Sequence, residues 1–389
     1  MTDSVKMCVD LRSMPEEARR EVEVFHNRTQ DKRWKFVSER YSKPIPAVSP
    51  MSGTGMELIT YWDGSGDQFL QSQIVASLNL PNALTGHNCE HGTSIFAAGV
   101  AGLELFKHRM VCDGVPGDAV DMLTTHHVSL HGATVTYLLC CADEKQARAN
   151  VLKMKAALRI LGYIPTANDS TNETFDMQRN GYLITVYHKT NFSHCIFSNE
   201  ELAETLKARA RCIIRIEVYM QGHYLRERGW EALESWRDAY AEGRYEVIFN
   251  ELVRGLFKLD VVLRHKAPRK EALKNLTATE REIVLAYLAG TPVDALPAIK
   301  EGATADARSK IKSKWKKTIR DKLRIDITIP WEQHKKLHHA EMDRLVRYPG
   351  DYHPDAVTVA ECFCKENWPK LRKRIKKLRS DEAARQTSA

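Results

Sequence analysis

The feature that most constrains the fold is a set of strand-like segments in which apolar and polar residues alternate. The alternation is present in residues 128–139, 182–188 and 212–219, and a period of two is typical of strands that bury one face. A fourth, shorter strand is expected near residues 173–177. Two helical stretches, 144–161 and 200–210, separate them. The sequence therefore predicts an α+β fold around a split β-α-β-β-α-β antiparallel sheet.

In this arrangement the first and third strands are central neighbours, and the fourth lies beside the first. The two helices cover one face of the sheet and leave the other open. The alternation sorts the side chains, because Ile214, Ile216 and Val218 must face the helices. Six polar residues are then expected on the open face: His127, His131, Tyr187, Lys189, Arg215 and Glu217.

These residue types suggest a chemistry. His127, His131 and Glu217 could hold a divalent cation that polarises a phosphodiester. Tyr187 could then attack phosphorus, with Lys189 lowering its pKa or neutralising phosphate charge. A plainer interpretation stays open, since a strand tyrosine, two polar strand histidines and an exposed arginine–glutamate pair can all be structural.

The second half of the chain differs in composition. Residues 1–235 are expected to form the domain with the sheet, and residues 236–389 a mainly helical, basic domain. Within the latter, a capping box at Thr277 and Glu280 opens a short helix, and a basic helix follows at about 304–324. Segment 277–324 resembles a helix-turn-helix unit that binds DNA. Its candidate DNA-binding residues are Lys310, Lys312, Lys314, Lys316, Lys317 and Arg320.

Bulk properties agree with a nucleic-acid partner. The formal net charge is +8, and the sequence KLRKRIKKLR near residue 375 adds a basic C-terminal tail. No apolar run approaches the roughly 20 residues that span a bilayer, and the N-terminus lacks the apolar core of a signal peptide. We expect a cytoplasmic protein with no membrane partner.

Three stretches resemble the replication initiators of filamentous bacteriophages, the gene II and gene X class of phage and plasmid replication proteins. ALTGHNCEHGTS matches the Gly-His-Asn block of that family at Gly86, His87 and Asn88. LITVYHK matches its Tyr-x-Lys strand at Tyr187 and Lys189. CIIRIEVYMQGHYLRERG matches its Arg-x-Glu strand, with matches at Arg215, Glu217, Tyr224 and Leu225.

The resemblance implies an enzyme that nicks one strand at an origin through a 5′-phosphotyrosine bond and starts rolling-circle replication. Tyr187 would be the nucleophile, assisted by Lys189, with Mg²⁺ or Mn²⁺ as cofactor. The implied partners are double- and single-stranded phage or plasmid origin DNA, and a helicase and single-strand-binding protein of a bacterial host. His87, Asn88 and Arg215 are candidate DNA contacts. His87, Cys89 and His91 also alternate as metal ligands can.

One stretch departs from the family. Where its members carry Arg-x-Asp, this chain has Leu130 and Gly132. Either His131 takes the ligand role or the metal site is altered. The alternative function is a non-enzymatic, sequence-specific DNA-binding regulator that uses segment 277–324.

Overall fold

The computed structural model describes residues 2–10, 14–21, 45–48, 55–61, 73–85, 87–89, 94–112, 114–166, 173–193, 195, 197, 200–259, 263–264, 266–292, 295, 304–336 and 338–349. These residues fall into two compact units. The first takes its described residues mainly from 1–147 and 176–246, and the second takes them from 148–175 and 247–348. Sequence composition did not indicate that residues 148–175 belong with the second half of the chain.

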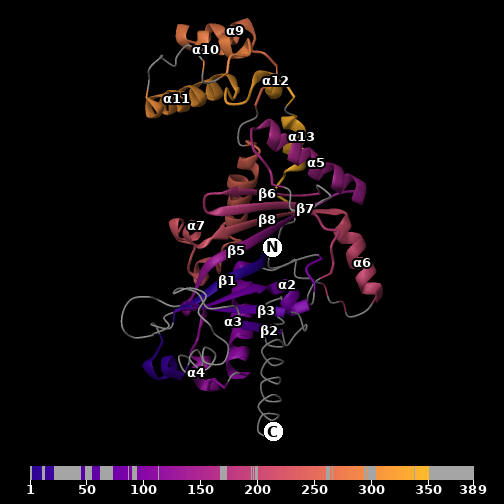
Figure 1. Cartoon of the computed structure of the whole chain (residues 1–389), viewed down its shortest axis with the longest axis vertical. Helices are drawn as coiled ribbons and strands as arrows, with labels where there is room; N and C mark the ends of the chain where they lie inside the picture. Colours follow the sequence, from indigo (N-terminus) through magenta and orange to yellow (C-terminus); the bar gives the residue numbers. More distant parts are fainter. Residues whose placement is uncertain are drawn as a thin grey trace. The chain divides into compact units, whose positions relative to one another are not determined.

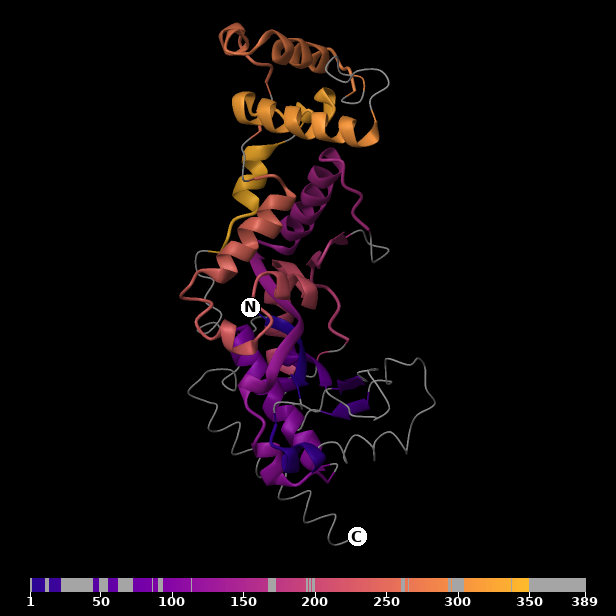
Figure 2. The same ribbon diagram turned by 90° about the vertical axis from the view of Figure 1, so that its left-hand side faces the viewer.

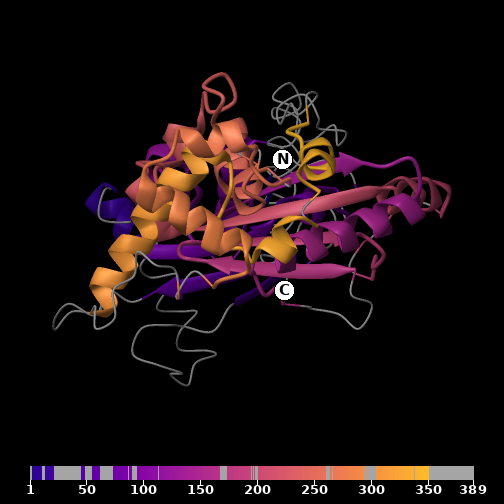
Figure 3. The same cartoon turned by 90° about the horizontal axis from the view of Figure 1, so that it is seen from above.

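The fold is α+β, as predicted, and its sheet is antiparallel. Eight strands lie in the order β2-β3-β4-β1-β5-β8-β7-β6 (Figure 1). In Figure 3 the longer strands run side by side across the sheet. The strands are β1 (Thr2–Asp10), β2 (Ile45–Val48), β3 (Gly55–Tyr61), β4 (Gln73–Asn79), β5 (Val128–Cys140), β6 (Thr174–Arg179), β7 (Tyr182–His188) and β8 (Ile213–Gln221).

The element order along the chain follows the prediction, and so does the pairing of the first and fourth strands, β5 and β8. Helix α5 (Glu144–Ile160) follows β5, and α6 (Glu200–Arg211) joins β7 to β8. Strand β8 pairs with both β5 and β7, so the predicted adjacency of the first and third strands is wrong. The periodicity of a strand defines its two faces but carries no information about its partner.

The predicted sorting of side chains between the two faces is confirmed on β7 and β8. Ile184 and Val186, and Ile214, Ile216 and Val218, are fully buried. On the other face, Tyr187 lies opposite Arg215, and Thr185 lies opposite Glu217. Strand β5, which flanks β8 on the edge away from β7, extends this polar face, because Thr136 pairs with Glu217.

Helix α3 (Ile95–Cys112) belongs to the first unit and packs against β1 and the 3-10 helix η3 (Leu233–Trp236). A buried hydrogen-bond chain fixes its start. The Tyr137 hydroxyl of β5 donates to the Tyr245 carbonyl at 2.7 Å, and the Ile95 backbone N–H donates to the Tyr245 hydroxyl at 2.8 Å. The apolar face of the sheet is thereby tied to the helix that it packs against.

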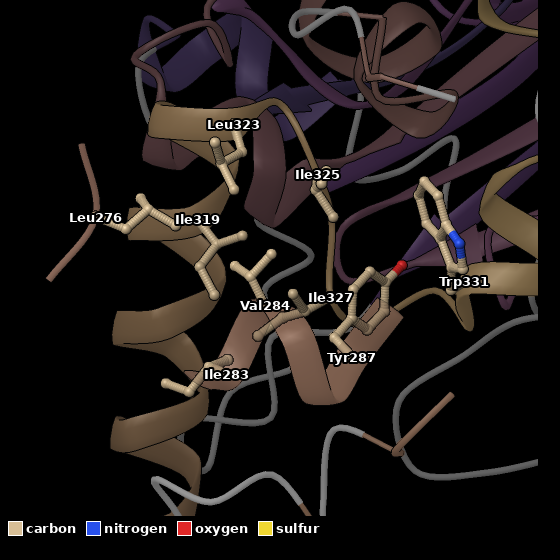
Figure 4. Close-up of a cluster of buried hydrophobic side chains, with 9 residues drawn as sticks. All are labelled: Leu276, Ile283, Val284, Tyr287, Ile319, Leu323, Ile325, Ile327 and Trp331. Atoms are coloured by element: carbon tan, nitrogen blue, oxygen red, sulfur yellow. The ribbon is translucent and has the colours of Figure 1, made fainter. Parts of the chain in front are cut away.

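The second unit contains a helical core. The short helix α9 (Lys270–Lys274) is followed by helix α10 (Ala278–Leu288) and helix α11 (Ala305–Leu323), which lie next to each other in Figure 2. Helices α12 (Trp331–His334) and α13 (His339–Leu345) follow. Figure 4 shows the buried cluster formed by Leu276, Ile283, Val284, Tyr287, Ile319, Leu323, Ile325, Ile327 and Trp331.

The predicted capping box of α10 is confirmed. The Thr277 side chain accepts from the Glu280 backbone N–H at 3.3 Å, and the Glu280 carboxylate accepts from the Thr277 N–H at 2.8 Å. Lys322 of α11 then donates to both Glu280 oxygens, at 2.7 and 2.8 Å. The cap therefore also links the two helices.

The connection between α10 and α11 does not fit a helix-turn-helix unit. Residues 289–304 separate the two helices, whereas that motif uses a turn of about 3–4 residues. Within the described residues, no helix is both long and apolar enough to cross a membrane.

A buried carboxylate anchors the segment that follows α11. Asp326 is fully buried, and its side chain accepts from Lys258 Nζ at 2.5 Å and from the Thr328 backbone N–H at 3.0 Å. Burial by itself raises the pKa of Asp326, but the Lys258 charge and these hydrogen bonds outweigh it, so the net pKa lies below the usual value.

This carboxylate predicts a loss of stability in acid. A lowered folded-state pKa contributes stability above the unfolded-state pKa, and that stability disappears as pH falls through the folded-state value. Between pH 6 and pH 3, the melting temperature of the wild type should fall further than that of Asp326→Asn. Equal falls in the two proteins, measured by circular dichroism, would contradict this role of Asp326.

Candidate active site at the end of strands β7 and β8

The candidate site lies where β7 ends and β8 begins. Tyr187 is next to the last residue of β7, and its cross-strand partner Arg215 is near the start of β8. Helix α6 lies in the chain between the two strands and contacts β8 (Figure 1). All these segments belong to the first unit.

The Tyr187 hydroxyl is held by a carboxylate. It donates a hydrogen bond to Glu217 Oε1 at 2.6 Å. The guanidinium of Arg215 lies 5.9 Å from the centre of the Tyr187 ring, and its Nε is 3.5 Å from the same Glu217 oxygen. The phenol oxygen therefore has a proton acceptor in direct contact and a cation alongside.

Two buried cations meet at Asn88. Lys189 Nζ donates to the Asn88 side-chain oxygen at 2.5 Å, and Arg215 donates to the Asn88 backbone carbonyl at 2.6 Å. Lys189 is only 7% exposed and Arg215 only 3%. Because desolvated cations are costly unless they are hydrogen-bonded, Asn88 stabilises both in place.

An apolar cluster positions the segment around Asn88. Cys89, Leu206 and Ala210 form its buried part, and Phe192, Cys195 and Phe197 pack against them. His87 stacks on Phe197, with ring centroids 5.5 Å apart. The cluster thus connects α6, the loop after β7 and the segment 87–89.

The thiol of Cys89 is buried and hydrogen-bonded to that of Cys195. A hydrogen bond with Cys195 and burial raise the pKa of Cys89 far above its usual value, although Lys189 and Arg215 oppose the shift.

The structure brings together most of the residues singled out by sequence. Tyr187, Lys189, Arg215 and Glu217 lie with Asn88, and His87 lies at the edge of the same cluster. Cys195 and Phe197 are further members that sequence reasoning missed. No local pattern marks them, because their roles depend on contacts across about a hundred residues of chain.

The two other predicted metal ligands lie elsewhere. His127 is in the 3-10 helix η2 (Thr125–His127), where its Nδ1 is 2.9 Å from Thr124 Oγ1. Glu217 lies opposite Thr136, so at about 3.4 Å per residue His131 is about 17 Å along β5 from it, and His127 lies beyond the start of β5.

His131 is the extra residue of a β-bulge, since Lys6 pairs with Gly132 whereas Met7 pairs with Leu130. Burial, with smaller effects of Lys6 and Arg226, lowers the pKa of His131. The predicted set of His127, His131 and Glu217 is therefore not assembled. The described residues contain no group of three or more acidic, histidine or cysteine side chains that could hold a metal ion.

The candidate DNA-binding residues of α11 lie in the second unit. Lys310, Lys314 and Lys317 are exposed, whereas Lys316 and Arg320 are partly buried. The side chain of Lys312 lies outside the described ones. Lys314 Nζ is 5.3 Å from the centre of the Trp315 ring.

Comparison with known proteins gave no match to a family model, a curated protein or a solved structure. The function must therefore be argued from the site itself.

The hydrogen bonds from Lys189 and Arg215 to Asn88 predict that Asn88 stabilises the first unit. Asn88→Ala removes the acceptor of the buried Lys189 ammonium, so the free energy of unfolding should fall by about 1.5–3 kcal/mol in urea titrations. Asn191→Ala is the matched control, since Asn191 is exposed and, among the described residues, its side chain accepts from the nearby Ser193 N–H alone. Similar losses of unfolding free energy in both variants would show that the Asn88 contact does not stabilise the unit more than an exposed side chain does.

Proposed function

We propose that this protein is a DNA nicking and joining enzyme that initiates rolling-circle replication, with Tyr187 as its nucleophile. The observation that carries the proposal is the hydrogen bond from the Tyr187 hydroxyl to Glu217, beside Arg215 and Lys189. A tyrosine, a proton acceptor and two buried cations are the groups that phosphoryl transfer to a phenol requires.

The proposed nicking step transfers a backbone phosphate from the 3′ oxygen of DNA to Tyr187. The Tyr187 oxygen attacks a backbone phosphorus while its proton passes to the Glu217 carboxylate. The bond from phosphorus to the 3′ oxygen breaks, and that oxygen leaves with the electron pair and takes up a proton from water. The products are a 5′-phosphotyrosine and a free 3′ hydroxyl.

Lys189 and Arg215 would stabilise the transition state. Negative charge grows on the phosphoryl oxygens as the phenol oxygen adds, and buried cations interact with such charge more strongly than exposed ones. Asn88 holds both cations, so it would act as a positioning residue.

Joining is the reverse reaction. A 3′ hydroxyl attacks the phosphotyrosine and gives its proton to water, the bond from phosphorus to the Tyr187 oxygen breaks, and the phenol regains its proton from Glu217. Because the phosphotyrosine keeps the energy of the original linkage, no nucleotide triphosphate is needed. This property suits an enzyme that opens a circular template and later closes it.

The resemblance to phage replication initiators adds the biological setting. It suggests double-stranded and single-stranded origin DNA as substrates, a helicase and a single-strand-binding protein as partners, and a bacterial host. It also suggests Mg²⁺ or Mn²⁺. The residues predicted to bind that ion do not come together, so the nicking and joining steps are assigned to protein side chains. The nicking assays contain magnesium.

The alternative is a DNA-binding regulator without catalysis. The exposed lysines of α11 favour it, because they present positive charge without requiring Tyr187. It predicts intact DNA binding and no covalent adduct in the wild type.

Replacement of the nucleophile gives the main test. Tyr187→Phe should abolish the protein–DNA adduct that survives denaturant, measured on supercoiled plasmid carrying the cognate origin. Tyr182→Phe is the control, since this β7 tyrosine packs edge-on against Tyr224, with ring centroids 5.6 Å apart, and lies on the opposite face. Adduct formation by Tyr187→Phe at the wild-type rate would refute the assignment.

Replacement of the proton acceptor gives a second test. Glu217→Gln keeps the size of the side chain but cannot take the phenol proton, so the single-turnover nicking rate should fall by about 10²–10⁴-fold. Glu231→Gln, which changes a surface partner of Arg226, should leave the rate unchanged. An unchanged rate in Glu217→Gln would exclude this carboxylate as the base.

A further inference from the structure

The second unit contains a basic cleft that none of the preceding roles uses. Its volume is about 870 Å³. Four cationic side chains and one acidic side chain line it, together with apolar surface such as that of Leu263. The charged residues are Arg264, Lys266, Arg269, Glu271 and Arg324.

Main-chain contacts hold the walls of the cleft together. The Arg264 N–H donates to the Arg324 carbonyl at 2.6 Å, which joins the segment before α9 to the end of α11. Arg324 directly follows α11 and has a φ of 60°, so the chain turns sharply there. Leu263 packs into a buried cluster with Leu161 and Ile329.

The four cationic side chains, in contrast, project from this anchored backbone into solvent. All four of these residues are exposed. Among the described residues, no salt bridge joins any of their charged groups to a carboxylate. Four like charges in one concavity repel one another, and a bound polyanion would relieve that repulsion.

We propose that this cleft binds the phosphate backbone of a single DNA strand. Its volume is in the range of small-ligand sites and suits a short stretch of one strand rather than a duplex. None of the described residues that line it is aromatic, so it offers charge but no platform for base stacking. Binding should therefore be insensitive to sequence. The choice of DNA among polyanions rests on the proposed function.

The test uses the full chain with Tyr187→Phe, so that no cleavage occurs and binding is measured apart from catalysis. Arg264→Gln with Arg269→Gln removes two cleft charges. Arg159→Gln with Arg344→Gln removes two exposed arginines elsewhere in the same unit and is the matched control. Fluorescence anisotropy with a labelled 20-nucleotide single strand, at several salt concentrations, gives the dissociation constants.

The cleft variant should bind the single strand about tenfold more weakly. The slope of log affinity against log salt should become shallower by about 1.4, which corresponds to two lost phosphate contacts at about 0.7 each. In the control pair, neither the loss of affinity nor the change in slope should exceed about a third of the value expected for the cleft variant. Thermal melting should confirm that both variants are folded.

Three results would overturn the proposal. They are an unchanged salt slope in the cleft variant, an equal loss in the control pair, and displacement of the oligonucleotide by micromolar pyrophosphate, which would indicate a small-anion site. An equal loss of affinity for the matching duplex would overturn the assignment to a single strand. Absence of an adduct in the wild type would refute catalysis by Tyr187 but leave this binding result standing.

Discussion

The candidate site depends on the register of the antiparallel pair β7–β8. That register places Tyr187 opposite Arg215, and Thr185 opposite Glu217, on one face of the sheet. A slip of one residue would turn Tyr187 toward the apolar face and bring a buried side chain such as Ile184 into the site. The fully buried Ile184, Val186, Ile214 and Ile216 prevent this slip, since each would lose its packing. The hydrophobic core therefore fixes the geometry of the polar site on the other side of the sheet.

The same pair of strands explains why the site can hold two buried cations. Lys189 follows the end of β7, and Arg215 lies near the start of β8, so both approach Asn88 at one end of the sheet. The aromatic and thiol side chains around Cys89 exclude water from this point, and the oxygen atoms of Asn88 replace it. Cations that are already desolvated and fixed need no reorganisation when a phosphate arrives, which is the property that the proposed chemistry uses.

In the second unit, some charged side chains are paired within the fold and others face solvent. Asp326, Lys258 and the Thr277–Glu280 cap are paired within the unit, whereas Lys310, Lys314 and the cations of the basic cleft face solvent. Positive charges that support the fold are thus neutralised, and those that remain are available for a polyanion. In the proposed function, this division would let one unit bind a strand while the other carries Tyr187.

The sequence by itself determined the element order from β5 to β8, the two faces of β7 and β8, and the capping box of α10, because these follow from short-range periodicity and local hydrogen bonding. It also marked Tyr187, Lys189, Arg215 and Glu217 as residues of one face. Only the tertiary structure decided that β8 lies between β5 and β7, that His127 in η2 and His131 in β5 lie far from Glu217, and that Asn88 joins the two cations. Strand partners and loop contacts depend on packing between distant segments, and no local pattern in the chain encodes them.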